Sequence, residues 1–239
     1  GVVMIGEISA FQSMGAVDGP GVRCVVFMQG CPLRCVYCHN PETWISGNGQ
    51  TVDTTQLVKK ILRYRSFICR GGGVTVSGGE PLVQADFCAD LFRRLKQEGI
   101  HTALDTSGMG NLDKAEEVLE YTDLVLCDLK FPSEEDYKKY CHGSLRQVLN
   151  FLDVVEKKHL PVWIRHVVVP GLTDDPENIR RIQRIAMKYS SVEKIELLPF
   201  KKICLSKYED LGLEFPLQDV PECGQQTIEN LYQIIEKNF

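Results

Sequence analysis

The sequence contains no apolar run long enough to cross a membrane and no excess of positive charge. A membrane-spanning helix needs about 20 consecutive apolar residues, and no stretch of the 239 residues approaches that length. The first residues, Gly1 to Ile5, lack the charged segment and the long apolar segment of a signal peptide. The formal net charge of −5 argues against a general nucleic-acid-binding surface. These absences predict a protein that binds neither membranes nor nucleic acids.

Cysteine is too sparse for a disulfide scaffold. Ten cysteines among 239 residues, 10/239, make up about 4% of the chain, below the roughly 8–10% of such scaffolds. Seven of them are scattered, and Cys24, Cys88 and Cys127 lie in apolar runs, where a thiol acts as a small buried hydrophobic group. Unpaired cysteines predict a reducing compartment, the cytoplasm.

Six short β-rich segments alternate with amphipathic helical segments. The predicted strands span residues 22–28, 74–77, 101–105, 124–129, 162–169 and 194–198. Helices are predicted at 54–67, 86–98, 113–121, after Ser144, from Pro176, and at 225–237. Because no low-complexity linker interrupts this succession, one domain over residues 1–239 is predicted, with parallel strands and helices outside them. Residues 200–224 are predicted to form a surface loop.

Polar residues and glycines follow the ends of these strands. They are Gly78-Gly79-Glu80, Asp105-Thr106, Asp128-Leu129-Lys130, Pro170-Gly171 and Phe200-Lys201. A doubly wound sheet is possible from the strand pattern alone, but in a barrel all these strand ends form one mouth. Six strands are fewer than the eight of a complete barrel. The predicted fold is therefore a partial, open (β/α)6 TIM-like barrel.

The densest chemical signal is a loop with the spacing C-x3-C-x2-C, formed by Cys31, Cys35 and Cys38 directly after the first predicted strand. Three thiolates can hold three irons of an iron–sulfur cube and leave the fourth iron open to another ligand. The alternative is a structural zinc ion with His39 as fourth ligand. Zinc ligands usually come as two separated pairs, whereas these candidates are nearly consecutive.

With Tyr37 directly before its last cysteine, the loop resembles the radical S-adenosylmethionine superfamily. The resemblance implies a [4Fe–4S] cluster held by Cys31, Cys35 and Cys38. It also implies that the amino and carboxylate groups of S-adenosylmethionine bind the fourth iron. One electron would then cleave the cofactor to a 5′-deoxyadenosyl radical.

A narrower resemblance covers almost the whole chain. Residues 18–23, 29–31, 37–44, 71–81, 104–108, 128–130 and 163–171 are similar to the activating enzymes of pyruvate formate-lyase. Many related activases carry a cysteine-rich insert, but residues 40–73 contain only Cys69. The resemblance implies hydrogen abstraction from a glycine of pyruvate formate-lyase, an electron from flavodoxin or ferredoxin, and a monomer. The alternatives are an activase of another glycyl-radical enzyme and a non-catalytic zinc-binding interaction protein.

The same resemblance assigns roles to the residues at the strand ends. Gly78, Gly79 and Glu80 would bind the methionine amino group of the cofactor. Lys130 would complement the cofactor carboxylate, and Asp18 would lie where the target glycine loop enters. The remaining predicted cofactor contacts are Tyr37, Cys38, His39, Asp105, Asp128, Leu129, Arg165 and Lys201.

Two predictions at the mouth depend on charge. Asp105 and Asp128 end neighbouring strands, and like charges repel unless a cation lies between them. The resemblance implies a monovalent cation at this position, with Thr106 as a further ligand. Arg165 lies inside an apolar strand, where an arginine is rarely buried without a partner, so we expect it to pair with a carboxylate. Lys201 stands where the resemblance leads one to expect histidine.

Overall fold

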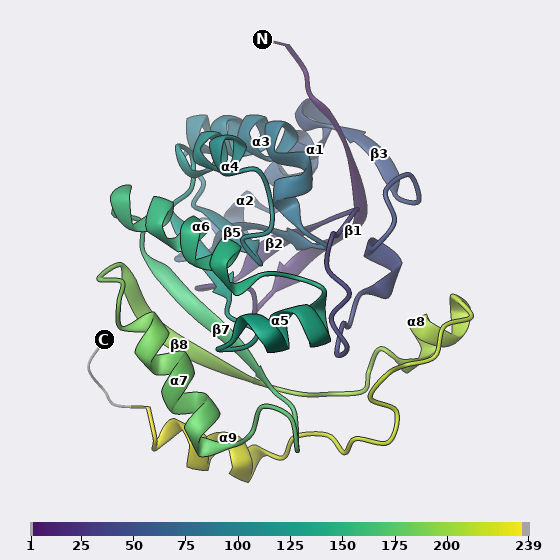
Figure 1. Cartoon of the computed structure of the whole chain (residues 1–239). Coiled ribbons are helices and arrows are strands. Elements are labelled where there is room, and N and C mark those ends of the chain that lie inside the picture. Colours follow the sequence, from purple (N-terminus) through teal and green to yellow (C-terminus); the bar gives the residue numbers. More distant parts are fainter. Residues whose placement is uncertain (1, 236–239) are drawn as a thin grey trace.

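The computed structural model describes residues 2–235, which form one twisted sheet with helices packed against it (Figure 1). Over these residues the sheet has eight strands, in the spatial order β3-β1-β2-β4-β5-β6-β7-β8. Their bounds are β1 (Ile5–Gly15), β2 (Arg23–Met28), β3 (Gln50–Asp53), β4 (Gly73–Gly78), β5 (Thr102–Thr106), β6 (Leu124–Asp128), β7 (Val162–Val168) and β8 (Val192–Pro199).

Six of these strands, β2 and β4 to β8, run parallel to one another. They coincide with the six predicted strands to within a few residues, so the partial barrel is confirmed. In the part of the chain that the structure describes, β8 and β3 are the two edges of the sheet and do not pair with each other. The barrel is therefore open on one side.

Strands β1 and β3 were not predicted. Both are antiparallel: β1 pairs with β2 and with β3. They extend the sheet beyond β2, on the side away from β8. The six-strand count thus holds for the parallel barrel, and the complete sheet is wider.

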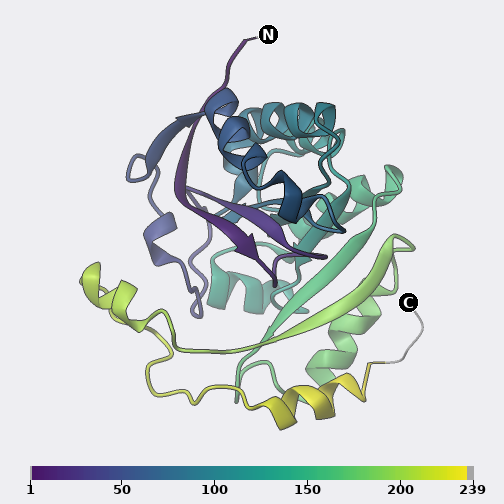
Figure 2. The ribbon, with the colours of Figure 1, turned by 180° about the vertical axis from the view of Figure 1, so that it is seen from behind.

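The helices are α1 (Thr54–Leu62), α2 (Arg65–Ile68), α3 (Ala85–Gln97), α4 (Leu112–Leu119), α5 (Glu134–Cys141), α6 (Leu145–Lys157), α7 (Pro176–Ala186), α8 (Leu205–Asp210) and α9 (Gln225–Tyr232), with 3-10 turns at Pro41–Thr43 and Pro81–Gln84. The single predicted helix 54–67 is divided into α1 and α2. Helices α5 and α8 were not predicted, and the last residues of the predicted C-terminal helix, 236–237, lie outside the described residues. Figures 1 and 2 show α1, α3, α4 and α6 in succession along the sheet, while α7 and α9 pack against β8.

Local sequence explains where the best-predicted helices begin. Ser144 accepts a hydrogen bond from the backbone N–H of Gln147 at the start of α6. Asp175 caps α7 in the same way, followed by Pro176 at the first helical position. A side-chain oxygen at this place satisfies N–H groups that have no partner within the helix.

Among residues 2–235, no helix combines the length and apolar composition that crossing a membrane requires.

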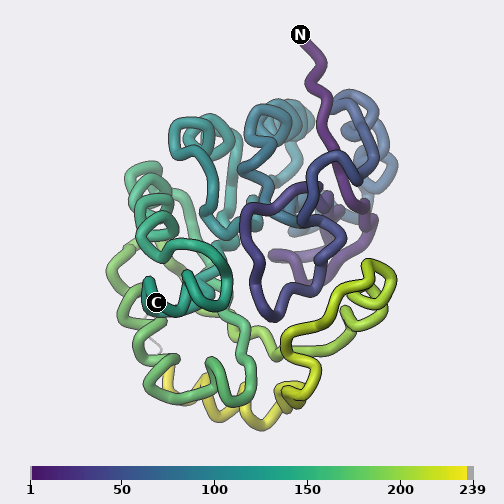
Figure 3. The backbone as a smooth tube through the Cα atoms, turned by 45° about the vertical axis from the view of Figure 1, so that its right-hand side comes forward, coloured from purple at the N-terminus to yellow at the C-terminus, as the bar shows by residue number. Residues whose placement is uncertain are grey.

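The expectation of a surface loop at residues 200–224 was only partly right. Most of the segment is irregular and exposed, but it contains α8 and buries five side chains, those of Phe200, Cys204, Tyr208, Phe215 and Cys223. Figure 3 shows this yellow-green segment beside the blue loop that follows β2. Burial of these side chains fixes the segment against the molecule and brings it to the mouth of the barrel.

Candidate active site

A cavity of about 520 Å³ lies at the carboxyl ends of the parallel strands. Cys31, Cys35 and Cys38 line it together. Other predicted residues share the lining: Tyr37, His39, Gly78, Gly79, Asp105, Asp128, Lys130, Arg165 and Lys201. Most of the residues predicted from the strand ends therefore line this one cavity.

Neighbouring segments hold the cysteine loop in position. The backbone N–H groups of Arg34 and Val36 donate to the carbonyls of Cys141 and Tyr140, over 2.8 and 2.9 Å. The Arg34 guanidinium lies 5.0 Å from the centre of the Trp44 ring, a cation–π contact. The last residues of α5 thus hold the cysteine loop through backbone hydrogen bonds, although α5 was not predicted from the sequence.

The three thiols suit an iron–sulfur cluster. Burial raises the pKa of Cys31 to about 12 and that of Cys38 to about 11. A hydrogen bond from the Cys141 thiol lowers the pKa of Cys35 to about 7. Soft thiolates are the donors that iron–sulfur clusters take, and forming them here from mostly buried thiols makes cluster binding release protons.

The zinc alternative does not fit this geometry. His39 Nε2 lies 2.8 Å from the carbonyl oxygen of Lys201; a carbonyl can only accept, so this nitrogen carries a proton. Across residues 2–235, no three His, Cys, Asp or Glu side chains converge closely enough to bind a single metal ion. A cube takes one thiolate per iron, so its three cysteines do not need to converge on one point.

Two glycines let the segment after β4 approach the cysteine loop. A Cβ on Gly79 would lie 2.3 Å from the carbonyl oxygen of Gly30. Gly78 has a φ of +111°, and a Cβ there would lie 2.2 Å from the backbone nitrogen of Met28. Only glycine fits at this close contact, which leaves the backbone of the segment exposed to the cavity.

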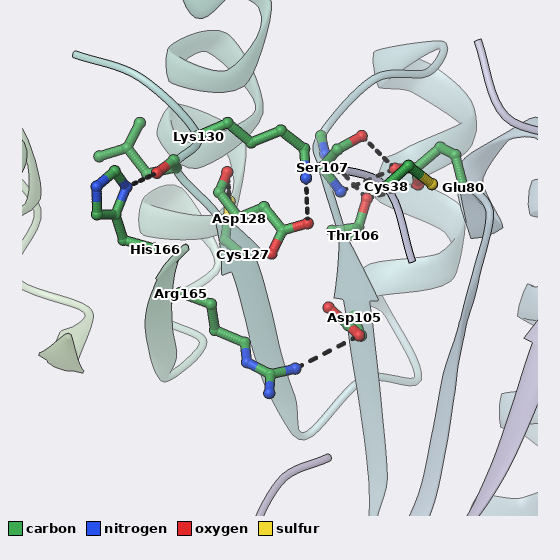
Figure 4. Close-up of polar contacts among 12 residues, drawn as sticks. Cys38, Glu80, Asp105, Thr106, Ser107, Cys127, Asp128, Lys130, Arg165 and His166 are labelled. Carbon is green, nitrogen blue, oxygen red and sulfur yellow. Dashed lines mark hydrogen bonds and ion pairs between the residues drawn. The ribbon is translucent and has the colours of Figure 1, made fainter. Parts of the chain in front are cut away.

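Glu80 and Thr106 lie outside the cavity lining. The Glu80 carboxylate is fully buried and accepts hydrogen bonds from the Leu82 N–H, the Thr106 hydroxyl, and both the N–H and the hydroxyl of Ser107. Burial raises its pKa. Figure 4 shows Glu80 turned toward Thr106 and Ser107. Glu80 thus ties the segment after β4 to the end of β5, and a contact with the cofactor would have to come from its backbone.

The charged residues at the mouth form two pairs (Figure 4). Lys130 Nζ lies 2.8 Å from Asp128 Oδ2, and Arg165 Nη1 lies 3.6 Å from Asp105 Oδ2. Arg165 also approaches Glu196 through Nε, at 3.4 Å. The predicted ion pairing of Arg165 is confirmed, and each carboxylate has a side-chain cation beside it. Burial, opposed by Arg165, raises the pKa of Asp105 to about 7.

Three further predicted residues take different positions. Lys201 lines the cavity and meets His39 through its carbonyl. Leu129 is fully buried outside the lining. Asp18 is half-buried beside the lining residue Val17, whose carbonyl accepts a hydrogen bond from Arg165 Nη2 over 3.1 Å.

Several lining residues were not predicted. Ser77 and Ser107 lie next to predicted positions, and the Ser77 hydroxyl donates to Asp105 Oδ2 over 2.6 Å. Their places in the strand-end motifs could have identified them. The apolar lining residues carry no such signal, because the sequence does not distinguish an apolar residue in the core from one in a cavity wall. They are Val17, Leu33, Trp44, Val167, Leu198 and Pro199.

Comparison with known proteins agrees with this site. The family model of the radical SAM superfamily matches residues 25–182. The pyruvate formate-lyase-activating enzyme of Clostridium pasteurianum is 44% identical over 98% of this chain and 99% of its own length. The pyruvate formate-lyase 1-activating enzyme of Escherichia coli K12 is 43% identical over 98% of this chain and 96% of its own.

A solved structure supports the same assignment. A domain of a pyruvate-formate lyase-activating enzyme from Bacteroides vulgatus superposes with a TM-score of 0.57 at 26% identity, covering 69% of this chain and 93% of that domain. Proteins can share a fold at much lower sequence identity, so identities of 44% and 43% over nearly the full length indicate a common family. The chain belongs to the radical S-adenosylmethionine superfamily and, within it, to the family of pyruvate formate-lyase-activating enzymes.

Proposed function

We propose that this chain activates pyruvate formate-lyase by generating a glycyl radical on it. The observation that carries the proposal is the shared cavity, in which the three thiols of one loop face the glycines and charged residues of four strand ends. The cofactors are a [4Fe–4S] cluster and S-adenosylmethionine, as in the family to which the chain belongs. When bound, they supply the 5′-deoxyadenosyl radical that removes a hydrogen atom from the target glycine.

The chain's own residues would hold and orient these groups. Cys31, Cys35 and Cys38 are proposed as the cluster ligands. The exposed backbone at Gly78 and Gly79 would accept the amino group of S-adenosylmethionine. Lys130, whose side chain is 12% exposed, keeps its positive charge in the cavity through Asp128 and would attract the cofactor carboxylate.

The charged groups at the mouth would complete this arrangement. Arg165 and Asp105 line the same cavity as the cysteine loop, and so do Tyr37, His39 and Lys201. A monovalent cation near Asp105 and Asp128 stays a prediction. Both carboxylates lie beside a side-chain cation, so such an ion would have to compete with Arg165 or Lys130 for their oxygens.

The open side of the barrel suits a macromolecular substrate. A loop of a folded partner has both ends attached to its protein, so it must enter sideways. The edges β8 and β3 do not pair in the described structure, and the segment with Val17 and Asp18 lies at the cavity. We therefore propose that the glycine loop of pyruvate formate-lyase passes over this segment.

The electron and the compartment are also part of the proposal. A flavodoxin or a ferredoxin would supply one electron to the cluster, and the chain would act as a monomer. A cytoplasmic location is supported by the ten cysteines, all of which are unpaired in the structure.

Anaerobic reconstitution tests the cofactor assignment. The protein loaded with iron and sulfide should turn brown and, once reduced, cleave S-adenosylmethionine to 5′-deoxyadenosine and methionine. Cys35→Ala should lose the colour and at least about 99% of the cleavage, because one iron loses its ligand. Cys69→Ala is the matched control, since Cys69 is exposed and outside the cavity. A colourless protein that holds zinc would overturn the assignment.

The substrate is tested by electron paramagnetic resonance. The reduced enzyme, mixed with S-adenosylmethionine and purified pyruvate formate-lyase, should give the doublet of a glycyl radical. A doublet with a different glycyl-radical enzyme and none with pyruvate formate-lyase would refute the proposed substrate while leaving the chemistry intact.

A further inference from the structure

Arg23 is a fully buried cation that the proposed chemistry does not use. It begins β2, lies outside the cavity lining, and is the largest side chain with no exposed surface. Within residues 2–235, the groups that its guanidinium contacts directly are neutral, while the carboxylates of Asp123 and Asp18 attract it from a longer distance. Buried arginines usually contact a charged partner directly, so this arrangement is unusual.

The guanidinium joins three segments of the chain. Nε donates to the Thr75 hydroxyl over 2.7 Å, and Nη1 donates to the carbonyl of Pro20 over 3.0 Å. Nη2 lies 2.9 Å from the carbonyl of Val74 and 3.0 Å from Nδ1 of His101. Arg23 therefore connects β4 and the residue before β5 to the segment 17–21, which follows β1.

Thr75 extends this connection to a second carbonyl of the same segment. Its hydroxyl donates to the carbonyl of Asp18 over 2.6 Å while it accepts from Arg23 Nε. A hydroxyl has one proton, so both directions are fixed. Segment 17–21 is thus held at Asp18 and at Pro20 by hydrogen bonds from the buried side chains of Thr75 and Arg23.

At Gly21 the segment packs backbone against backbone. Gly21 has a φ of +68°, and a Cβ there would lie 2.2 Å from the carbonyl oxygen of Gly71. A Cβ on the neighbouring residue Gly72 would lie 1.8 Å from the carbonyl oxygen of Val22. At Gly19 the segment instead faces the Arg23 side chain. The bonds to the Asp18 and Pro20 carbonyls therefore hold the part of the segment that precedes this close backbone contact.

We infer that Arg23 and Thr75 are positioning residues that set segment 17–21 in the conformation that receives the glycine loop of the partner. The inference rests on the proposed function. Val17 lines the cavity, and its carbonyl accepts from Arg165, so the segment borders the proposed cofactor site. Arg23 and Thr75 do not line the cavity themselves, and segment 17–21 is their connection to it.

Thr75→Val tests this role, because valine keeps the shape of threonine and removes the hydroxyl. In the holoenzyme, the KM for pyruvate formate-lyase should rise roughly tenfold, the effect of one lost hydrogen bond. The kcat, the cleavage of S-adenosylmethionine without partner, and the cluster absorbance should stay within twofold of wild type. Thr75→Ser is the matched control; it restores the hydroxyl and should restore the KM.

A second measurement does not depend on which partner is correct. Amide hydrogen exchange of residues 17–22 in the holoenzyme alone should accelerate at least fivefold in Thr75→Val, with exchange in β6 unchanged. Should Thr75→Val not accumulate as folded protein, Thr75→Ala removes the same hydroxyl without placing a methyl group beside the guanidinium.

Three results would overturn the inference: a KM within twofold of wild type, unchanged exchange at residues 17–22, or an equal loss of cofactor cleavage, which would place the damage in the cavity itself. Failure of the proposed function looks different. There the wild-type enzyme itself gives no glycyl doublet, while exchange at residues 17–22 still reports on Thr75.

Discussion

At the scale of single residues, buried polar side chains hold the backbone at the mouth of the barrel in position. His166 is fully buried; its Nδ1 lies 2.7 Å from the carbonyl of Leu129 and its Nε2 lies 3.1 Å from Nδ2 of Asn178. The carbonyl can only accept, so Nδ1 carries the proton and Nε2 accepts from the amide. This neutral imidazole holds Leu129 in place between Asp128 and Lys130 (Figure 4).

This arrangement predicts a pH dependence of stability. Burial lowers the pKa of His166 to about 4, from 6.5. Between these values the unfolded chain binds a proton that the folded protein excludes, so stability is complete above 6.5 and falls as the pH drops toward 4. From about pH 7.5 to about pH 5, the free energy of unfolding should fall by about 2 kcal/mol more in wild type than in His166→Gln.

Urea unfolding at the two pH values measures this difference. The glutamine variant does not titrate, and the other ionisable groups act alike in both proteins, so the comparison isolates the imidazole. Equal pH dependence in wild type and variant would show that His166 is protonated in the folded state.

At the scale of elements, the chain after β8 secures the cysteine loop. The Tyr208 hydroxyl donates to the carbonyl of Cys38 over 2.9 Å. Lys207 Nζ lies 2.9 Å from Asn40 Oδ1 and 2.5 Å from Glu42 Oε1. Short helix α8 therefore places two side chains on the segment that carries the last cysteine.

Removing one hydroxyl tests the importance of α8 for the cluster. Tyr208→Phe should lower stability by about 1 kcal/mol and speed the release of iron to a chelator severalfold, because the Cys38 backbone loses its anchor. Tyr232→Phe is the matched control. Tyr232 lies on α9, and its hydroxyl accepts a hydrogen bond from the Leu197 N–H over 2.8 Å, away from the cysteine loop. Equal iron release in both variants would contradict a role for α8.

Strands and helices could be predicted from the sequence where their buried residues are consecutive or recur at regular spacing. All but one of the residues of β2 are buried, and α6 buries Val148, Phe151, Leu152 and Val155 along one face. The missed elements lack such patterns. β1 exposes apolar residues such as Ile5 and Met14, α5 buries only Tyr137 and Cys141, and α8 buries only Tyr208.

At the scale of the whole molecule, the two sides of the open sheet are joined around the mouth. The edges of the sheet do not pair in the described structure, yet the chain after β8 contacts the loop after β2 through His39, Tyr208 and Lys207. The cysteine loop is one side of this contact. Binding of the cluster should therefore stabilise both sides together.

Hydrogen exchange of the protein with and without its cluster measures this coupling. Without iron, amides in residues 38–44 and 201–208 should exchange at least tenfold faster, because a bound ligand stabilises whatever its site depends on. Amides in β4 to β6 form the internal control and should change little. Faster exchange in residues 38–44 alone would show that the two segments are not coupled.

The candidate site could be predicted to the extent that it follows from strand ends. Parallel strands bring their carboxyl ends to one mouth, which placed the cysteine loop, Asp105, Asp128 and Lys130 correctly around one cavity. That rule does not say which way a side chain turns after the strand. Glu80 and Thr106 turn toward each other, and only the three-dimensional structure reveals it.

The contacts between α8 and the cysteine loop have a consequence for how the protein is made. They join residues 165 to 170 positions apart in the chain. Ribosomes add about 5–20 residues per second, so roughly 8–34 s separate synthesis of the cysteine loop from synthesis of the helix that contacts it. During this interval the cysteine loop lacks its contacts with α8, and the length of the barrel sets how long it remains without them.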